Sequence, residues 1–421
     1  MAEKHFDFLF IGGGILGSAG AMCLAEKLDG SARIGVIDVD LEGEHSSTLK
    51  NAGGVRSTWR NRANIELCKY SIDFYETIRE EVQFRQHGYY WMHGDKSWEE
   101  IQRNYPLYVE YGLNVELYAH DRITDILPFV DNTEGIAGVS ISRKSGLLDH
   151  YSLREYYREK ARKLGVEFVD GCFVTDIAVK DGSVTSVKAV LLYSKGMDGG
   201  SADRSEAIKD CLLSSDAPTG GEELSFGCGA LINTAGAWAP RIAQLYGFTD
   251  SQVKPRRRQM VVINCPDVDL SGYGMVIDTS DVYFHKDAEN ILVGYSNIDE
   301  EYGYNIRFDF GGMDEDSPFF RYIWSPLYNR ISKFERLKFL RGWAGLYAET
   351  PDRSGFLGRV PGLLNVYECC AHTGRGLMIS YGAGTALADL ITDGELRQEL
   401  RRAGDLSRER PAGGMYEQLH L

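Results

Sequence analysis

The sequence lacks the patterns typical of membrane, metal-binding and disulfide-stabilised proteins. No apolar run approaches the length of a transmembrane helix. The N-terminal MAEKH leads directly into an apolar stretch, so we expect no signal peptide. The nine histidines show neither HxH nor HExxH spacing, so we expect no metal site. The eight cysteines form no CxxC pair, and the adjacent Cys369 and Cys370 are poorly placed for a disulfide. We therefore expect a cytoplasmic protein with reduced thiols.

Basic residues are fewer than acidic residues. The chain has 46 Lys and Arg against 61 Asp and Glu, a net charge of −15, so a phosphate backbone would repel it and no nucleic-acid partner is expected. The short basic run at residues 256–258 is interpreted as a solvated or ion-paired strand end. A length of 421 residues suffices for two domains or one large interleaved unit.

A glycine-rich turn near the N-terminus is the most informative motif. Residues 8–11 are apolar and predict a strand, glycines follow at GxGxxG spacing, and residues 15–28 predict a helix. Gly12 permits a tight turn, Gly14 lets a pyrophosphate approach the backbone, and Gly17 lets the helix pack on the strand. The N-terminus of the helix then attracts the anion.

A second strand, residues 33–38 (RIGVID), ends in the carboxylate of Asp38. An acid at this point binds a ribose 2′-hydroxyl and repels a 2′-phosphate, so the motif favours FAD or NAD over NADP. An NAD-only dehydrogenase agrees with the first 40 residues but not with the last 80.

Periodicity predicts the remaining elements. Helices are expected at residues 64–81, 149–164, 319–328 and 374–390; strands at 84–92, 166–171 and 229–238; a hairpin at 173–192 turning at Asp181–Gly182; and an antiparallel sheet over about 255–345. Residues 194–227 are rich in Gly, Ser and Asp and are interpreted as a mobile insertion without chemistry. The tail after Gly394 is charged and is expected to be helical or frayed.

Seven motifs in one order give the chain a wider resemblance. It resembles the D-amino-acid oxidase superfamily of FAD-dependent amine oxidoreductases over nearly its whole length. Within that superfamily it looks closest to the sarcosine and dimethylglycine oxidoreductase branch and to the FAD-dependent oxidoreductase-domain protein of complex I assembly. The motifs are FIGGGILG (10–17), SSTLKNAGGVR (46–56), NTAGAWAP (233–240), VKPRRRQMVVI (253–263), VYFHKDAENILVGYS (282–296), WAGLYAETPDRSGFLG (343–358) and HTGRGLMISYGAG (372–384).

The resemblance implies an α/β fold in which a glutathione-reductase-type FAD-binding Rossmann domain is interleaved with an antiparallel β-sheet substrate domain. The expected FAD-binding domain comprises residues 1–85, 150–250 and 341–395, and the substrate domain comprises 86–149 and 251–340. Residues 194–227 form the insertion, and residues 396–421 form the charged C-terminal tail.

The resemblance also places residues at the cofactor. Asp38 would hold the adenosine ribose, Val174 would meet the adenine through its backbone, and Ala235–Gly236 would pass the ribityl and phosphate groups. Independently, a helix that starts near Gly376 would point its positive end at the flavin N1–C2=O locus, where charge accumulates on reduction. The full expected set is Gly12, Gly14, Ile15, Leu16, Gly17, Asp38, Ser47, Thr48, Asn51, Ala52, Gly53, Val174, Ala235, Gly236, Trp238, Gly345, Gly374, Arg375, Gly376, Leu377 and Met378.

Departures from the family pattern are equally informative. Lys50 stands where dimethylglycine dehydrogenase-like members carry a histidine joined to the flavin, and Gly345 stands where monomeric sarcosine oxidases carry a cysteine joined to it. We therefore expect non-covalent FAD. The oxygen-activating lysine of monomeric sarcosine oxidase falls on Leu292 and a nearby active-site histidine on Ser296, which disfavours fast oxidase turnover.

Several residues are candidates for substrate contact. Arg56 matches an arginine that clamps the substrate carboxylate in sarcosine oxidases, while the partner lysine is replaced by Met378. An equal alternative is that Arg56 only caps the flavin or pairs with an acid. The other candidates are Tyr283, His285, Tyr347 and Arg375, and Trp59, Trp91 and Trp343 are interpreted as packing residues.

Together these observations predict an FAD enzyme that oxidises a C–N bond in a small secondary or tertiary amine or an N-substituted amino acid by hydride transfer to flavin N5. The electron acceptor could be oxygen, a quinone or an electron-transfer protein. Two alternatives remain open at this point. The chain could oxidise a 2-hydroxy acid on the same fold, or it could be an FAD-containing assembly or scaffold protein with little turnover.

Overall fold

The computed structural model of the chain describes residues 4–192, 201–214, 218, 220–249, 252–296, 300–312, 314–411 and 417, with the backbone alone for 201–203. Parts of the predicted insertion and of the predicted C-terminal tail therefore lie outside the described residues. In the described part, no helix has the length and apolar character needed to cross a membrane.

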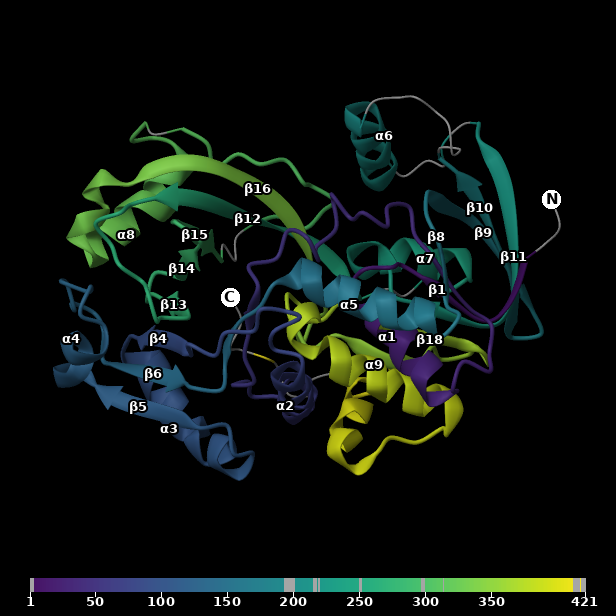
Figure 1. Cartoon of the computed structure of the whole chain (residues 1–421), viewed down its shortest axis with the longest axis horizontal. Coiled ribbons are helices and arrows are strands. Elements are labelled where there is room, and N and C mark those ends of the chain that lie inside the picture. Colours follow the sequence, from purple (N-terminus) through teal and green to yellow (C-terminus); the bar gives the residue numbers. More distant parts are fainter. Residues whose placement is uncertain are drawn as a thin grey trace.

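Two large β-sheets lie on opposite sides of the molecule (Figure 1). In the first, β1 pairs in parallel with β2 and β11, β8 continues beyond β2, and β18 and β17 continue beyond β11. The hairpin of β9 and β10 pairs with the first half of β11 and turns at Asp181 and Gly182, as the sequence predicted. The strands are β1 (Lys4–Ile11), β2 (Ile34–Ile37), β8 (Glu167–Val169), β9 (Cys172–Lys180), β10 (Ser183–Leu191), β11 (Glu222–Asn233), β17 (Phe356–Arg359) and β18 (Val366–Cys370).

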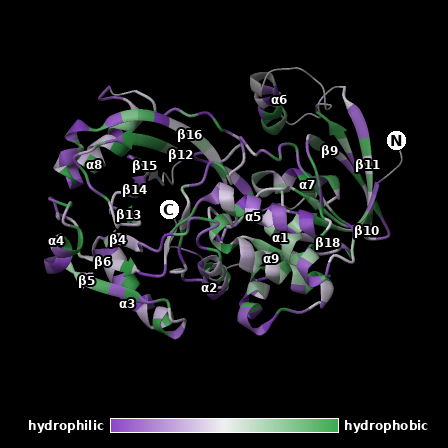
Figure 2. Cartoon of the chain, in the orientation of Figure 1, coloured by the Kyte–Doolittle hydropathy of each residue, from purple (hydrophilic) through white to green (hydrophobic). Residues whose placement is uncertain are grey.

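Both faces of this sheet are buried, because each is covered by other elements. Phe10 faces a core formed with helices α1, α2, α5 and α9, whereas its neighbours Leu9 and Ile11 face the β9–β10 hairpin and helix α7. Helices α1 and α9 are largely hydrophobic, while α5, which packs on α1, carries many hydrophilic residues (Figure 2). These helices are α1 (Ile15–Lys27), α2 (Arg62–Thr77), α5 (His150–Lys163), α7 (Ala239–Leu245) and α9 (Gly376–Thr392).

The second sheet is mostly antiparallel and has the order β16-β12-β15-β14-β13-β4-β6-β5. One of its faces packs on α8 (Ser325–Arg330) and the π-helical turn Phe320–Trp324, through residues such as Val261 and Phe284. Its strands are β4 (Tyr89–His93), β5 (Val115–Ala119), β6 (Gly138–Ser142), β12 (Lys254–Asn264), β13 (Met275–Ile277), β14 (Val282–Asp287), β15 (Asn290–Tyr295) and β16 (Lys338–Glu349).

The other face of this sheet turns toward the first sheet. This face is apolar and includes Met260 of β12, Tyr283 of β14 and Leu292 of β15. Side chains alternate between the two faces along each strand, so every second residue contributes to it. A short ribbon of β3 (Gly54–Val55) and β7 (Gly146–Leu147) contributes Leu147 to the same surface. The region between the two sheets is therefore lined by both of them.

Three details differ from the sequence expectations or add to them. The strand expected at 84–92 starts only at Tyr89, and helix α3 (Asp95–Glu110), which the periodicity did not single out, follows it. The predicted insertion contains helix α6 (Ser201–Leu213) and the start of β11. The division into two domains stays a prediction, and β16 lies wholly in the antiparallel sheet although it crosses the boundary placed at residue 341.

The remaining short helices are α4 (Ile123–Ile126) and the 3₁₀ segments His120–Arg122, Gly236–Trp238, Ser332–Arg336 and Gln398–Leu406.

Candidate active site

The glycine turn after β1 adopts the tight geometry that its spacing predicts. Gly12 has φ +105°, and a Cβ there would lie 2.5 Å from the carbonyl oxygen of Thr234. A Cβ on Gly17 would lie 1.8 Å from the carbonyl oxygen of Gly12, so Gly17 serves the packing of α1 against the turn. Gly14 is the N-cap residue of α1 and provides no side-chain cap. The N-terminus of α1 thus opens toward the space beside the turn.

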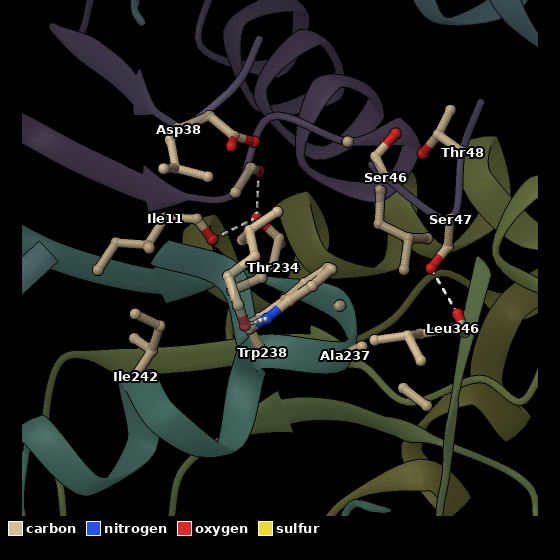
Figure 3. Close-up of a pocket in the computed structure, with 18 of the residues that line it drawn as sticks. Ile11, Asp38, Ser46, Ser47, Thr48, Thr234, Ala237, Trp238, Ile242 and Leu346 are labelled. Carbon is tan, nitrogen blue, oxygen red and sulfur yellow. Dashed lines mark hydrogen bonds between the residues drawn. The ribbon is translucent and has the colours of Figure 1, made fainter. Parts of the chain in front are cut away.

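Asp38 lies where β2 ends and faces this turn (Figure 3). Its carboxylate accepts hydrogen bonds from the backbone N–H of Gly13 at 2.5 Å and of Asp40 at 3.0 Å. Burial raises the pKa of Asp38 to about 6, and these two hydrogen bonds act against that rise. At neutral pH the carboxylate is therefore ionised and held at the rim of the turn.

A cavity of about 440 Å³ runs from this turn between the two sheets. In Figure 3, Asp38 and Ile11 lie on one side of it, Ser46, Ser47 and Thr48 on another, and Thr234 and Trp238 between them. Fifteen of the expected cofactor residues line it, namely Gly12, Gly14, Ile15, Leu16, Asp38, Ser47, Thr48, Asn51, Val174, Ala235, Gly236, Trp238, Gly374, Gly376 and Leu377.

The remaining expected cofactor residues lie elsewhere. Ala52, Gly345 and Met378 line a second cavity, and Gly17 packs under the glycine turn. Gly53, with φ +74°, and Arg375 line neither cavity.

The second cavity has a volume of about 70 Å³ and adjoins the first. Six residues line both cavities: Ser47, Asn51, Leu346, Tyr347, Thr373 and Gly374. The second cavity therefore meets the larger cavity at these six residues. The wall of the second cavity includes two guanidinium groups, from Arg56 and Arg258, and three phenolic side chains, from Tyr89, Tyr283 and Tyr347. None of the described residues that line it carries a carboxylate or an imidazole. This small space is therefore suited to an anionic group.

Arg56 is almost completely buried at 1% exposure. Its Cζ lies 3.6 Å from the ring centroid of Trp59 and 5.0 Å from that of Trp91, and its Nη1 donates to the carbonyl oxygen of Thr58 at 2.8 Å. Burial lowers the pKa of Arg56 to about 10, so the group keeps its positive charge at neutral pH.

The two predicted tyrosines both reach the second cavity. Tyr283 donates to the sulfur of Met260 at 3.1 Å, and burial raises its pKa well above the usual range. Burial also raises the pKa of Tyr347, while the nearby Arg258, 5.0 Å from the Tyr347 ring, acts in the opposite direction. Both phenols are therefore neutral hydrogen-bonding groups at physiological pH.

His285 and Arg375 lie outside both cavities. The ring nitrogens of His285 lie 3.0 Å from the carbonyl oxygen of Ala52 and 2.8 Å from that of Lys286, and burial lowers its pKa. Arg375, at the N-cap of α9, is fully buried behind Trp59 and donates to the carbonyl oxygen of Arg353. A catalytic role for either residue stays a prediction.

Arg258 is a charged residue of the second cavity that sequence reasoning missed, as it also missed Tyr89. Arg258 was grouped with its neighbours as a strand end, and the structure confirms an ion pair, with Nη2 of Arg258 3.2 Å from Glu349. Arg258 is nevertheless 6% exposed and lines the second cavity. Its two-residue spacing from Met260, on the apolar face of β12, is the signal that could have identified it.

A family model described as FAD dependent oxidoreductase (DAO) matches residues 7–390. The chain belongs to this DAO family. The FAD-dependent oxidoreductase domain-containing protein 1 of Xenopus laevis is 28% identical over 94% of this chain and 80% of its own length. The beta subunit of sarcosine oxidase from Rhizobium meliloti is 21% identical over 93% of this chain and 86% of its own length.

Solved structures share the mixed α/β fold of the DAO family. The L-proline dehydrogenase of P. horikoshii superimposes with a TM-score of 0.77 at 22% identity, covering 96% of this chain and 98% of its own. The glycine oxidase of Bacillus cereus superimposes with a TM-score of 0.70 at 18% identity, covering 97% of this chain and 100% of its own. The expected fold and family are thus confirmed, and the cofactor of the family is FAD.

The larger cavity fits the FAD of the DAO family. A Cβ on Gly14, Gly236 or Gly376 would meet no protein atom closer than 3.3 Å. The missing side chains of these glycines therefore enlarge the cavity and are not required for packing within the protein. The ionised Asp38 and the N-terminus of α1 lie on the same wall, which suits a ribose next to a pyrophosphate.

Proposed function

We propose that this chain oxidises a C–N bond of a small secondary or tertiary amine or of an N-substituted amino acid. The observation that carries the proposal is Arg56, a buried and charged side chain on the wall of a small cavity that adjoins the FAD cavity. A charge-assisted contact in such a desolvated position would bind a substrate carboxylate strongly. When bound, FAD supplies the redox chemistry by accepting a hydride at N5 from the carbon next to nitrogen.

The residues of the larger cavity would orient the cofactor. Gly12 and Gly14 would cradle the pyrophosphate, with Gly17 holding α1 on the turn, and Asp38 would accept a hydrogen bond from the adenosine ribose. The positive N-terminal end of α9, at Gly376, would lie beside the pyrimidine side of the flavin. That placement would favour electron uptake, because negative charge accumulates there.

In the second cavity, Arg56 would hold the substrate carboxylate and the hydroxyl of Tyr347 would help to orient it. Tyr283 and Met260 would exclude water from the reacting carbon. Among the described lining residues there is no carboxylate or imidazole to act as a general base. An amine that binds in its neutral form needs no general base.

The names of relatives support an amine or amino-acid substrate. Sarcosine oxidase, glycine oxidase and L-proline dehydrogenase are all named for an amino acid. The FAD-dependent oxidoreductase domain-containing proteins, 27–28% identical to this chain, are named for no substrate.

Anaerobic flavin bleaching tests the proposal directly. The holoprotein is mixed with a panel of N-methyl amino acids, cyclic imino acids, small uncharged amines and 2-hydroxy acids, and the visible flavin band is followed. Bleaching by an N-substituted amino acid supports the proposal. Bleaching by 2-hydroxy acids alone would replace it with hydroxy-acid oxidation. An unbleached flavin across the panel, in a protein that dithionite reduces, would favour the scaffold alternative.

A further inference from the structure

Helix α6 (Ser201–Leu213) belongs to neither layer of helices that covers the sheets. It lies apart from α1, α5 and α9, above α7 (Figure 1). Of its described apolar side chains, only Ile208 and Leu212 are buried. A helix that buries so few apolar side chains contributes little to a hydrophobic core. The polar contacts of α6 and the cavity residues that it provides therefore indicate its role.

The C-terminal end of α6 forms part of the wall of the cofactor cavity. Cys211, Leu212 and Ser214 line the larger cavity, together with Val174 of β9 and Trp238. None of these five residues lines the second cavity. These five residues therefore border the FAD cavity without bordering the substrate cavity.

Two donors hold this end of the helix in place. The indole Nε1 of Trp238 donates to the carbonyl oxygen of Leu212 at 2.8 Å, and Nη1 of Arg241 donates to the same oxygen at 2.9 Å. The carbonyl groups in the last turn of a helix lack partners within the helix, and a cation is favourable beside them. The terminal turn of α6 is thus fixed to two residues that themselves line the FAD cavity.

The N-terminal half of α6 is held by charge. The guanidinium of Arg204 lies 2.8 Å from Asp170, 3.3 Å from Glu42 and 3.7 Å from Asp40. Nε2 of His45 lies 3.1 Å from the hydroxyl of Ser205. Asp40 also lines the FAD cavity, so both ends of α6 bridge to its rim. Arg204 keeps 28% of its side chain exposed, so salt can weaken this contact.

We infer that α6 closes the adenosine end of the FAD cavity, and that FAD enters and leaves by displacement of this helix. The inference rests on the proposed placement of the adenine near Val174. The ion pairs of Arg204 hold α6 against the cavity, and the hydrogen bonds from Trp238 and Arg241 fix the position of its last turn. Because none of the described α6 residues lines the second cavity, displacement of the helix changes the retention of FAD without removing a group that meets the substrate.

The test measures FAD release, which requires no substrate and is independent of the proposed reaction. Holoprotein is diluted into buffer containing an excess of an FAD-binding apoprotein as a trap, and the release rate is followed by flavin fluorescence. We expect Arg204→Ala to release FAD about five to ten times faster than wild type, since it loses several partly exposed ion pairs. Lys209→Ala is the matched control, because Lys209 pairs with Glu206 within the helix. Added salt should accelerate release from wild type and leave Arg204→Ala little changed.

Cys211 supplies a second readout. It is partly exposed, whereas the other seven cysteines are buried. N-ethylmaleimide should label Cys211 more slowly in holoprotein than in apoprotein, and faster in the Arg204→Ala holoprotein than in wild type. Cys211→Ser confirms the site of labelling. Equal release rates in wild type and Arg204→Ala, or labelling of Cys211 that is indifferent to FAD, would overturn the inference. Unchanged melting temperatures exclude a general loss of folding as the cause.

Discussion

The guanidinium of Arg56 stacks on the indole of Trp59, with 3.6 Å between Cζ and the ring centroid. The indole Nε1 of Trp59 in turn donates to the backbone carbonyl oxygen of Arg56 at 3.1 Å. A cation over an aromatic face is attracted by the ring quadrupole, and the hydrogen bond fixes the ring in that position. Trp59, interpreted from the sequence as a packing residue, thus orients Arg56 before any ligand arrives, which reduces the entropy lost on binding.

Arg56→Ala should raise KM or abolish turnover while the FAD content stays unchanged. Loss of a charge-assisted contact in a desolvated cavity costs roughly 2–5 kcal/mol, or about one to four orders of magnitude in kcat/KM. Arg56→Lys should recover only part of the loss, because an ammonium cannot supply two parallel hydrogen bonds.

Arg341→Ala is the control for this variant. Arg341 also lies over an indole, 5.7 Å from the Trp343 ring, but it is exposed and lines neither cavity. It should leave kcat/KM unchanged. Loss of FAD from Arg56→Ala would instead make Arg56 a cofactor residue, and unchanged kinetics would indicate a substrate without a carboxylate.

Gly14→Val should abolish FAD binding without preventing folding. The nearest protein atom to an added Cβ is the hydroxyl oxygen of Thr48 at 3.3 Å, so a branched side chain can be accommodated by the fold while it fills the proposed pyrophosphate space. The flavin absorbance of purified protein, set against its melting temperature as apoprotein, measures the effect. Gly311→Val, at an exposed glycine with nothing within 4 Å of an added Cβ, should retain full FAD. A Gly14→Val protein with normal flavin content would remove the pyrophosphate from this turn.

FAD should be released by acid precipitation into a yellow supernatant. Lys50 and Gly345 both line the second cavity, and a Cβ on Gly345 would lie 2.8 Å from Cβ of Lys50. The two positions at which relatives of the sarcosine and dimethylglycine branch would attach flavin are thus adjacent here, and neither offers an imidazole or a thiol. Flavin that remains with the precipitate after washing would contradict the expected non-covalent binding.

Reduced enzyme should reoxidise slowly in air-saturated buffer and rapidly with a quinone or an artificial dye. Leu292, which the resemblance places at the oxygen-activating lysine of monomeric sarcosine oxidase, is 6% exposed and packs in the apolar face of the second sheet. No cation therefore comes from that position to stabilise negative charge on oxygen. Stopped-flow reoxidation at matched acceptor concentrations measures both rates. Reoxidation by oxygen as fast as by the dye would refute the argument from Leu292.

Local patterns in the sequence predicted the glycine turn and Asp38, because the geometry of a strand–turn–helix unit depends on its own residues. Residues whose positions depend on distant segments were harder to place. Tyr283 and His285 point to the same face of β14, yet the ring of His285 is hydrogen-bonded to the carbonyl oxygen of Ala52, 233 residues away in sequence. Arg258 could not be separated from its neighbours until the register of β12 fixed which side chains face the cavity. The contacts of α6 likewise join segments that no local period connects.

Asp389→Asn should lower stability at neutral pH, and the difference from wild type should shrink in acid. Burial raises the pKa of Asp389, but hydrogen bonds from Arg397, at 2.7 and 2.9 Å, and from Lys27 outweigh it and hold the pKa at about 2. A carboxyl whose pKa is lower in the folded than in the unfolded protein stabilises the fold above about pH 4, and this contribution is lost as pH falls through 2. It amounts to about 2 kcal/mol at pH 7, since the shift is close to two units.

The urea unfolding of apoprotein measures this effect at pH 7 and at several acidic values. Asp393→Asn is the matched control, because Asp393 pairs with the same Lys27 at 2.5 Å but is half exposed, and it should change stability little. The ion pair that Asp389 makes joins α1, α9 and the start of the C-terminal segment, so its loss should also loosen that segment to proteolysis. An Asp389→Asn protein as stable as wild type at pH 7, or a difference that persists at pH 2, would show that the paired carboxylate does not stabilise this junction.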